Sequence, residues 1–259
     1  MAWSALAQQF CLELGFGVLL ALAFVPGAPV GSFFYRLMGT TAALPIALAL
    51  VTRASASSLA DPVLWSTGLA LAAYPLYSGP IRGRWWVLGL ALGLLGSGLA
   101  TVWIVAQGLD GLGWLGGAVA GASALATGAV AGSVGLAMVL GHWYLTVPKM
   151  ELRHLRRLNR LTVATLLCSA LLCAISCLVF AQVLRASRPP LFAPMGLFYL
   201  GTRIAVGLAL PLVFAAMAAS SLRFGNTRSA TGILYASTVL VLIGTAVSIF
   251  LQDSYRVPL

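Results

Sequence analysis

Long apolar stretches with almost no charge inside them constrain this chain more than any other feature of its sequence. Each stretch can cross the hydrocarbon core of a bilayer, which takes about 20 helical residues. Only 8% of the 259 residues are charged and 61% are hydrophobic, a composition that excludes a soluble domain. The sequence therefore predicts one all-α, polytopic transmembrane helix bundle over residues 1–259. The eight expected spans are roughly 5–25, 33–52, 62–78, 85–107, 114–145, 160–184, 196–220 and 229–252.

The basic residues of the predicted loops divide unequally between the two ends of this bundle. One end carries Arg36, Arg82, Arg84, Lys149, Arg153, Arg156, Arg157, Arg160, Arg223 and Arg228. The other end carries Arg53, Arg185, Arg188 and Arg256. Because cytoplasmic loops are enriched in Lys and Arg, the first end is expected in the cytoplasm and both termini on the outer side. The expected location is the cell inner (plasma) membrane.

The net charge of +10 does not predict nucleic-acid binding, because the basic residues lie in short loops between apolar helices. The strongest cluster is the basic loop 149–160, where Leu152, Leu155 and Leu158 recur every three residues. That spacing predicts a short amphipathic helix lying on the membrane surface. Anionic lipid headgroups are its expected partner, and a cytoplasmic protein subunit is the alternative.

Small residues recur at every fourth position in two of the expected spans. The positions are Gly89, Gly93 and Ser97 in one span, and Gly113, Gly117, Gly121, Ala124, Gly128 and Gly132 in the other. Such spacing lets helix backbones approach closely, so it predicts either the interior of the bundle or a dimer face. Pro45, Pro75 and Pro211 also fall inside spans, where each is expected to kink its helix.

Two charged side chains, Glu13 and Arg203, must lie inside the membrane. A charge in hydrocarbon costs at least about 2.5–3.5 kcal/mol on insertion scales, so such residues are functional candidates. Glu13 is about eight residues into its span and Arg203 about seven residues into its own. Both spans start on the expected outer side, which places the two charges at similar depth, on the order of 10–12 Å below the outer boundary.

Two further polar side chains share helix faces with this pair. Tyr199 precedes Arg203 by one turn, and Gln9 precedes Glu13 by one turn. If the first and seventh spans are neighbours, the four groups converge in an apolar wall. They would bind and deprotonate a quinol headgroup, with Glu13 as proton acceptor and Arg203 and Tyr199 holding oxygens. The alternative is an ion pair that only fixes helix register.

His142 is the remaining candidate ligand, at the expected cytoplasmic end of the fifth span. It is predicted to serve a proton path there, since histidine changes charge near neutral pH; the alternative is an interfacial side chain with a structural hydrogen bond. The other histidine, His154, lies twelve residues away, so bis-histidine haem b is not expected, while haem with one histidine ligand stays open. No CxxC motif occurs, which disfavours iron–sulfur clusters and covalent haem, and no metal site is expected.

Eight helices, outer termini and few extramembrane residues resemble the membrane-anchor subunits of the dimethyl-sulfoxide-reductase and polysulfide-reductase type. The segment Ser229-Ala230-Thr231-Gly232-Ile233-Leu234-Tyr235, which opens the last span, is also similar to that family. The resemblance implies two four-helix halves, a quinone site near the outer face and a partner subunit that carries iron–sulfur clusters.

These patterns lead to three hypotheses of function. The first is an integral-membrane subunit of a respiratory or redox complex that interacts with quinone or quinol near the outer face, together with other protein subunits. The second is a small-solute or proton-coupled transporter, for which matching halves with broken helices would be diagnostic. The third is a non-catalytic scaffold whose glycine-rich faces pack other membrane proteins or pigments.

Overall fold

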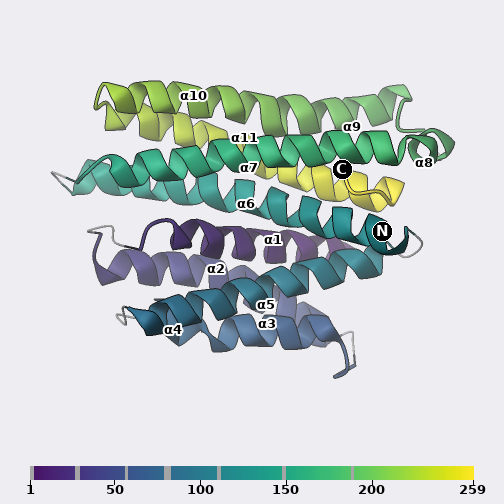
Figure 1. Cartoon of the computed structure of the whole chain (residues 1–259), viewed down its shortest axis with the longest axis horizontal. Coiled ribbons are helices and arrows are strands. Elements are labelled where there is room, and N and C mark those ends of the chain that lie inside the picture. The colour runs from purple at the N-terminus through teal and green to yellow at the C-terminus, as the bar shows by residue number, and fades with distance from the viewer. Residues whose placement is uncertain are drawn as a thin grey trace.

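The computed structural model describes residues 3–26, 30–55, 58–78, 83–109, 112–147, 150–187 and 190–259. Within these ranges the chain is all-helical and contains no strand (Figure 1). The elements are α1 (Trp3–Ala23), α2 (Gly31–Ala54), α3 (Pro62–Ala72), α4 (Tyr74–Ser78), α5 (Arg84–Gly108), α6 (Gly113–Thr146), α7 (Arg153–Val179), α8 (Ala181–Ala186), α9 (Pro194–Ile204), the π-helix η1 (Ala205–Ala209), α10 (Leu210–Arg223) and α11 (Thr227–Tyr255).

Seven helical segments within the described residues are long and apolar enough to cross a membrane. They are α1, α2, α5, α6, α7, the continuous segment Pro194–Arg223 formed by α9, η1 and α10, and α11. The protein is therefore an all-helical, multi-pass membrane protein. Each of these segments lies within a few residues of an expected span, apart from the earlier start of α7 described below.

The expected third span, 62–78, is divided between α3 and α4. Asp61 caps α3 by accepting a hydrogen bond from the Val63 amide at 3.0 Å, and Pro62 occupies the first turn. The helix breaks at Ala73, two residues before Pro75, because proline lacks an amide hydrogen and its ring obstructs the preceding turn. Whether α3 and α4 together make an eighth crossing stays a prediction.

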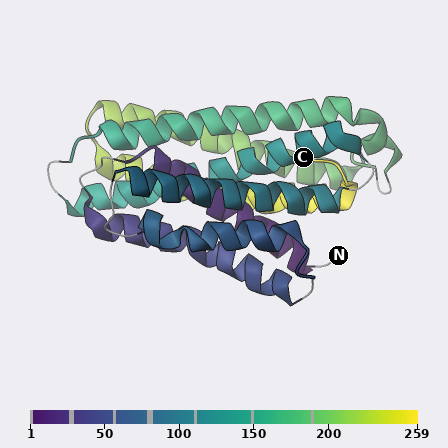
Figure 2. The same ribbon diagram turned by 60° about the horizontal axis from the view of Figure 1, so that its bottom comes forward.

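The helices run nearly parallel, and α6 lies in the middle of the bundle (Figure 1). In that view α1 to α5 lie on one side of α6, and α7 to α11 lie on the other. Contacts between α6 and α1, α5, α7 and α11 agree with this central position. Both chain ends lie at the same end of the bundle in both views (Figures 1 and 2). We call it the terminal end and the opposite one the basic end.

The described basic residues divide between these two ends as the sequence indicates. The basic end carries Arg36, Arg84, Arg153, Arg156, Arg157, Arg160, Arg223 and Arg228, and the terminal end carries Arg53, Arg185 and Arg256. Arg82, Lys149 and Arg188, which also belong to the charge prediction, lie outside the described residues. Which end faces the cytoplasm stays a prediction.

Two pairs of glycines bring helix backbones into direct contact. On α1, a Cβ at Gly17 would overlap the backbone of α6 at Gly128 and Gly132. On η1, a Cβ at Gly207 would collide with the Cα of Gly244 in α11. The small-residue spacing of the fifth predicted span therefore forms part of the bundle interior at Gly128 and Gly132.

Pro211 perturbs its span in a different way from the other two prolines. The π-helix Ala205–Ala209 ends two residues before Pro211, and the chain continues as α10. Because Pro211 has no amide hydrogen to give to the ladder and its ring crowds the preceding turn, a locally wider π-turn is the expected accommodation. Pro45, by contrast, lies within α2, which is assigned as one unbroken α-helix.

The prediction of a short surface helix within the basic loop 149–160 is wrong for residues 150–160, which the structure describes. Residues from Arg153 onward form the first turns of α7, which continues without a break to Val179. Leu155 and Leu158 are fully buried in the main core, so they anchor this end of α7 against its neighbours. The three-residue leucine spacing is therefore the buried face of a long helix.

Candidate functional site

Glu13 lies on the buried side of α1, with only 1% of its surface exposed. Its Oε1 atom accepts a hydrogen bond of 2.8 Å from Nε2 of Gln9, one turn earlier on the same helix. Its Oε2 atom has no hydrogen-bond partner in the part of the chain that the structure describes. A buried carboxylate oxygen without a donor is costly, so this atom marks a position where a proton, a water or a ligand donor would be favourable.

Gln9 connects Glu13 to the terminal end of the bundle. Its side-chain amide pairs with that of Gln252 on α11: Nε2 of Gln252 donates to Oε1 of Gln9 at 3.2 Å, and Nε2 of Gln9 lies 3.4 Å from Oε1 of Gln252. Both glutamines line a small pocket of about 90 Å³, and Asp253 and Arg256 also line it. Polar groups thus run from this pocket to the Glu13 carboxylate.

Arg203 is the second buried charge, with 2% of its surface exposed. Its Nη2 atom donates to the hydroxyl of Ser169 on α7 at 2.8 Å and to that of Thr127 on α6 at 3.0 Å. Nη1 lies 3.5 Å from the carbonyl oxygen of Gly244 on α11. The Nε atom has no partner. Three helices therefore hold the guanidinium with neutral acceptors, and its Nε–H is unused among the described residues.

Glu13 and Arg203 lie near one another without forming an ion pair. No contact within 4 Å joins their charged atoms, although the two charges do interact electrostatically. The central helix α6 links them: Thr127 accepts from Arg203, and the next residue, Gly128, packs against the Glu13 backbone. The predicted similar depth of the two charges is consistent with this arrangement. A register-fixing salt bridge between them is absent.

An apolar groove lies beside Arg203, between α7 and the α9–η1–α10 segment. Its volume is about 550 Å³. The lining residues are Leu166, Ala170, Cys173, Ala174, Cys177, Leu178, Ile204, Leu208, Ala209 and Leu212. Ile204 directly follows Arg203, and Ala170 and Cys173 flank Ser169, which holds the guanidinium. The groove therefore offers a hydrocarbon-compatible surface beside a buried cation.

A series of polar side chains extends from Arg203 toward the basic end, between α6 and α7. Ser169 holds the guanidinium, and the next polar pair in that direction is Thr165 with Ser133, whose hydroxyls lie 3.2 Å apart. Thr162 follows one turn further on α7 and is buried, whereas Asn159 donates to the Ala215 carbonyl of α10 and so lies outside this interface. The four hydroxyl side chains form a polar seam through an otherwise apolar interface.

Tyr199 does not join the two charges through its hydroxyl. Its ring lies 4.8 Å from that of Phe250 on α11 and 5.6 Å from that of Phe198. Within the part of the chain that the structure describes, its hydroxyl makes no hydrogen bond to Glu13 or Arg203. Tyr199 therefore packs as an aromatic side chain, and its proposed contact with a headgroup stays a prediction.

His142 lies apart from this centre. It is exposed near the basic end of α6, and its Nδ1 atom is 3.5 Å from the hydroxyl of Tyr235. It follows Thr127 by fifteen residues, which is about 22 Å along the helix axis. Among the described residues, no group of three or more His, Cys, Asp or Glu side chains could hold a metal ion. Whether haem b binds through one histidine stays a prediction.

Sequence reasoning missed three residues that complete the centre: Gln252, Thr127 and Ser169. Gln252 had a usable signal, because it lies near the terminal end of the last span, at a depth that matches Gln9. Thr127 and Ser169 had none. Hydroxyl side chains are frequent in membrane helices, where they bond their own backbone, so nothing in the sequence distinguishes these two.

In comparisons with known proteins, no family model, no curated protein and no solved structure matches this chain. The fold and the site define an all-helical integral-membrane protein with a divided, buried polar centre. One half of that centre is the Glu13 carboxylate with Gln9 and Gln252, and the other half is the Arg203 guanidinium with Thr127 and Ser169.

Proposed function

We propose that this protein is the membrane subunit of a redox complex, and that it binds a quinone or quinol and takes up its protons. The observation that carries the proposal is the unpartnered Oε2 atom of Glu13, buried in the bundle but linked by Gln9 and Gln252 to the pocket at the terminal end. A carboxylate held in this way is suited to accept a proton and release it toward that end.

The groove between α7 and the α9–η1–α10 segment supplies the ligand-binding part of the proposal. A quinol has an apolar isoprenoid tail and a ring with two hydroxyl groups. The tail would lie on the apolar lining of the groove, and the ring would approach Arg203, whose Nε has no partner. On oxidation the ring would lose two electrons, which pass to a partner subunit, and two protons, which would pass one after the other by way of the Thr127 hydroxyl to the Glu13 carboxylate and from there toward the terminal end.

This assignment agrees with the resemblance to the anchor subunits of the dimethyl-sulfoxide-reductase and polysulfide-reductase type. In that family the quinone site lies near the outer face, and the terminal end is the expected outer end here. Arg203 lies in the half of the segment Pro194–Arg223 nearer to that end, and Glu13 lies at the middle of α1. The partner with iron–sulfur clusters and the location in the inner membrane belong to the same proposal.

The test uses the full chain in lipid nanodiscs with a short-chain quinol, which is oxidised at an electrode that replaces the partner subunit as electron acceptor. Calorimetry measures binding, and infrared difference spectroscopy of the carboxylic-acid band measures proton uptake by the protein. Arg203→Gln is expected to weaken quinol binding about tenfold, because it removes a buried charged donor. Glu13→Gln is expected to preserve binding and abolish proton uptake. The exposed residues Arg185 and Glu151 provide the matched controls Arg185→Gln and Glu151→Gln.

Three outcomes would contradict the proposal. Wild-type protein that binds no quinol rejects it outright. Binding that Arg203→Gln leaves unchanged removes Arg203 from the site. Proton uptake that persists in Glu13→Gln removes Glu13 as the acceptor. Arg203→Lys, which keeps the charge, separates a binding defect from a folding defect, since it should recover part of the affinity.

The polar seam between α6 and α7 favours a second candidate, a proton-coupled transporter. Thr162, Thr165 and Ser133 extend from Ser169 in the direction of the basic end, and the Gln9–Gln252 pair lies on the other side of the two charges. Together they place polar groups on both sides of the two buried charges. Proteoliposomes with an internal pH dye test this candidate: a solute-dependent proton flux that Thr165→Val reduces would favour transport over redox chemistry.

A further inference from the structure

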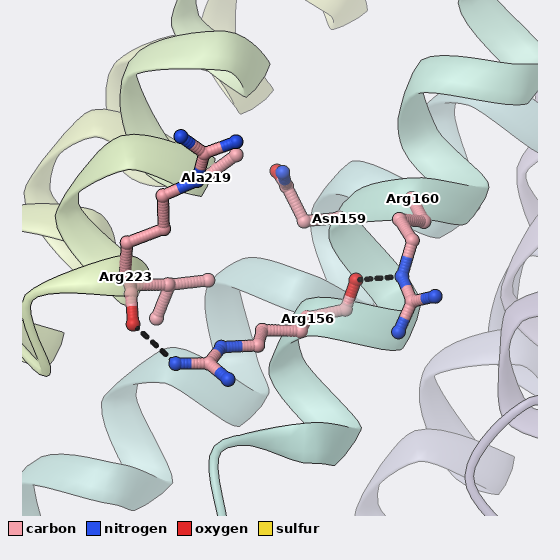
Figure 3. Close-up of a pocket in the computed structure, with 6 residues that line it drawn as sticks. Arg156, Asn159, Arg160, Ala219 and Arg223 are labelled. Atoms are coloured by element: carbon pink, nitrogen blue, oxygen red, sulfur yellow. Dashed lines mark hydrogen bonds between the residues drawn. The ribbon is translucent and has the colours of Figure 1, made fainter.

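The arginine pocket at the basic end lies between α7 and α10, away from the buried charges. Its volume is about 460 Å³, and its lining residues are Arg156, Asn159, Arg160, Ala219, Leu222 and Arg223 (Figure 3). Arg156 and Arg160 are one turn apart on α7, and Arg223 ends α10. Two helices that are distant in sequence thus contribute three guanidinium groups to one concave surface.

Among the described residues, these three cations have no carboxylate partner. The ion pairs among the described residues join Arg53 to Asp61, Arg153 to Glu151 and Arg256 to Asp253, and none involves the pocket. Within the pocket, Arg156 donates to the carbonyl oxygen of Leu222 at 2.8 Å. Nε of Arg160 lies 3.5 Å from the carbonyl oxygen of Arg156. Most of their N–H donors remain available to a ligand.

The position of the cluster on α7 adds to its positive potential. Arg153, Arg156, Arg157 and Arg160 occupy the first turns of the helix, and its first turn contains no acidic residue. Cations at a helix N-terminus face the positive end of the helix dipole, and like charges one turn apart repel each other. An anion bound between α7 and α10 would offset both effects.

Asn159 gives an independent sign of a ligand. It is 98% buried, and its side chain extends toward the space between Arg223 and Arg160 (Figure 3). Its Nδ2 atom donates to the carbonyl oxygen of Ala215 on α10 at 2.9 Å, which fixes the orientation of the amide. Its Oδ1 atom has no hydrogen-bond partner among the residues that the structure describes. The pocket therefore offers cationic donors together with one unused acceptor, and a matching ligand carries an anion and a hydroxyl group.

We propose that this pocket binds the headgroup of an anionic phospholipid that has free hydroxyls, such as phosphatidylglycerol. The phosphodiester would contact Arg160 and Arg223, and a glycerol hydroxyl would donate to Asn159. The membrane favours a lipid over a free anion as the source. The pocket lies at the ends of two spans, where headgroups lie, and Arg160 also lines a neighbouring surface with the apolar residues Phe24, Leu161 and Ala164.

Native mass spectrometry of the full chain in detergent tests the proposal, with defined lipids added singly. Phosphatidylglycerol is expected to bind about tenfold more tightly than phosphatidylcholine. Phosphatidylmethanol, which has the same charge and no free hydroxyl, is expected to fall between them. Arg160→Gln and Arg223→Gln should each weaken phosphatidylglycerol several-fold and phosphatidylcholine little. Arg185→Gln, at the opposite end, is the matched control.

Each other result would overturn part or all of the proposal. Equal binding of phosphatidylglycerol and phosphatidylcholine, or equal losses in Arg185→Gln and Arg160→Gln, removes the site. Equal binding of phosphatidylglycerol and phosphatidylmethanol removes the hydroxyl contact to Asn159. Displacement of the lipid by inorganic phosphate or glycerol phosphate at low concentration would identify a soluble anion as the ligand. Thermal unfolding of both arginine variants distinguishes lost binding from lost folding.

Discussion

Gly17 of α1 lies backbone to backbone against Gly132 of α6, so that a Cβ on either residue would overlap the other helix. Glu13 is one turn before Gly17. The second close crossing repeats this relationship, because Arg203 is one turn before Gly207, which packs against Gly244. Each buried charge is therefore next to a point where two helices are in direct contact. Both charges are therefore held beside a close contact between two helix backbones.

Gly132→Ala is expected to destabilise the protein by about 1–3 kcal/mol, because the added methyl group must separate α1 from α6. Gly117→Ala is the matched control on the same helix. A Cβ at Gly117 meets nothing within 4 Å, so that variant should be neutral or slightly stabilising. Thermal unfolding in a mild detergent measures both. Equal effects of the two substitutions would contradict the close crossing.

Ser169→Ala should be destabilising, by about 1–3 kcal/mol, because it removes an acceptor from a buried guanidinium. Ser176→Ala, two turns further along α7, provides the contrast. Its hydroxyl is also buried but has no hydrogen-bond partner, so its loss should be neutral or favourable. If denaturant unfolding gives the same stability for both variants, Ser169 does not hold Arg203.

Asp61 predicts a pH-dependent contribution to stability at the terminal end. Burial raises the pKa of this carboxyl, but hydrogen bonds from Arg53 at 2.5 Å and from the Val63 amide lower it more, so its pKa lies below the ordinary value. A lowered folded pKa stabilises the protein above about pH 4, and the contribution disappears as the pH falls through the folded value.

Asp61→Asn keeps the cap on α3 and removes the ion pair with Arg53, so it should cost about 1 kcal/mol at neutral pH. The difference from the wild type should shrink as the pH falls below about 4 and disappear once it is below the folded pKa of Asp61, where both side chains are neutral. Unfolding at a series of pH values measures it. A difference that stays constant down to pH 2 would show that the charge of Asp61 contributes nothing.

The Gln9–Gln252 pair is expected to protect Glu13 from reagents in water. A water-soluble carbodiimide should label Glu151, whose side chain is 65% exposed, and leave Glu13 unlabelled. Gln252→Ala enlarges the adjacent pocket and should make Glu13 reactive. Peptide mass spectrometry measures labelling at each carboxyl. Equal labelling of Glu13 in the wild type and in this variant would show that the glutamine pair does not control access.

The helices were predictable because membrane spans depend on length and apolar content, which the sequence displays directly. Which helices pack against each other was harder to predict. The first and seventh spans carry Glu13 and Arg203, yet they do not pack directly against each other: α6 and α11 intervene. The neighbour relations of helices depend on shape matching across many side chains, which no single-residue pattern contains.

The two charges were predictable as candidates, since only their cost inside a membrane was needed to select them. Their partners were not. An ion pair was the simplest expectation for opposite charges at one depth, and instead each is held by neutral groups, Gln9 for Glu13 and Thr127 and Ser169 for Arg203. The orientation of each side chain about its helix decides which partners it meets, and the sequence does not display that orientation.

The π-helix η1 makes the number of residues in the segment Pro194–Arg223 more important than which apolar residues those are. One additional residue in a turn rotates everything beyond it by about 100°. Arg203 before η1 faces α6, α7 and α11, while Ala215 beyond it accepts a hydrogen bond from Asn159 of α7. Deleting one residue from Ala205–Ala209 would therefore misalign the two faces, whereas exchanging Val206 for another apolar residue would preserve both. In this segment the number of residues between Arg203 and Ala215, rather than the identity of the side chains between them, determines which way each of the two faces.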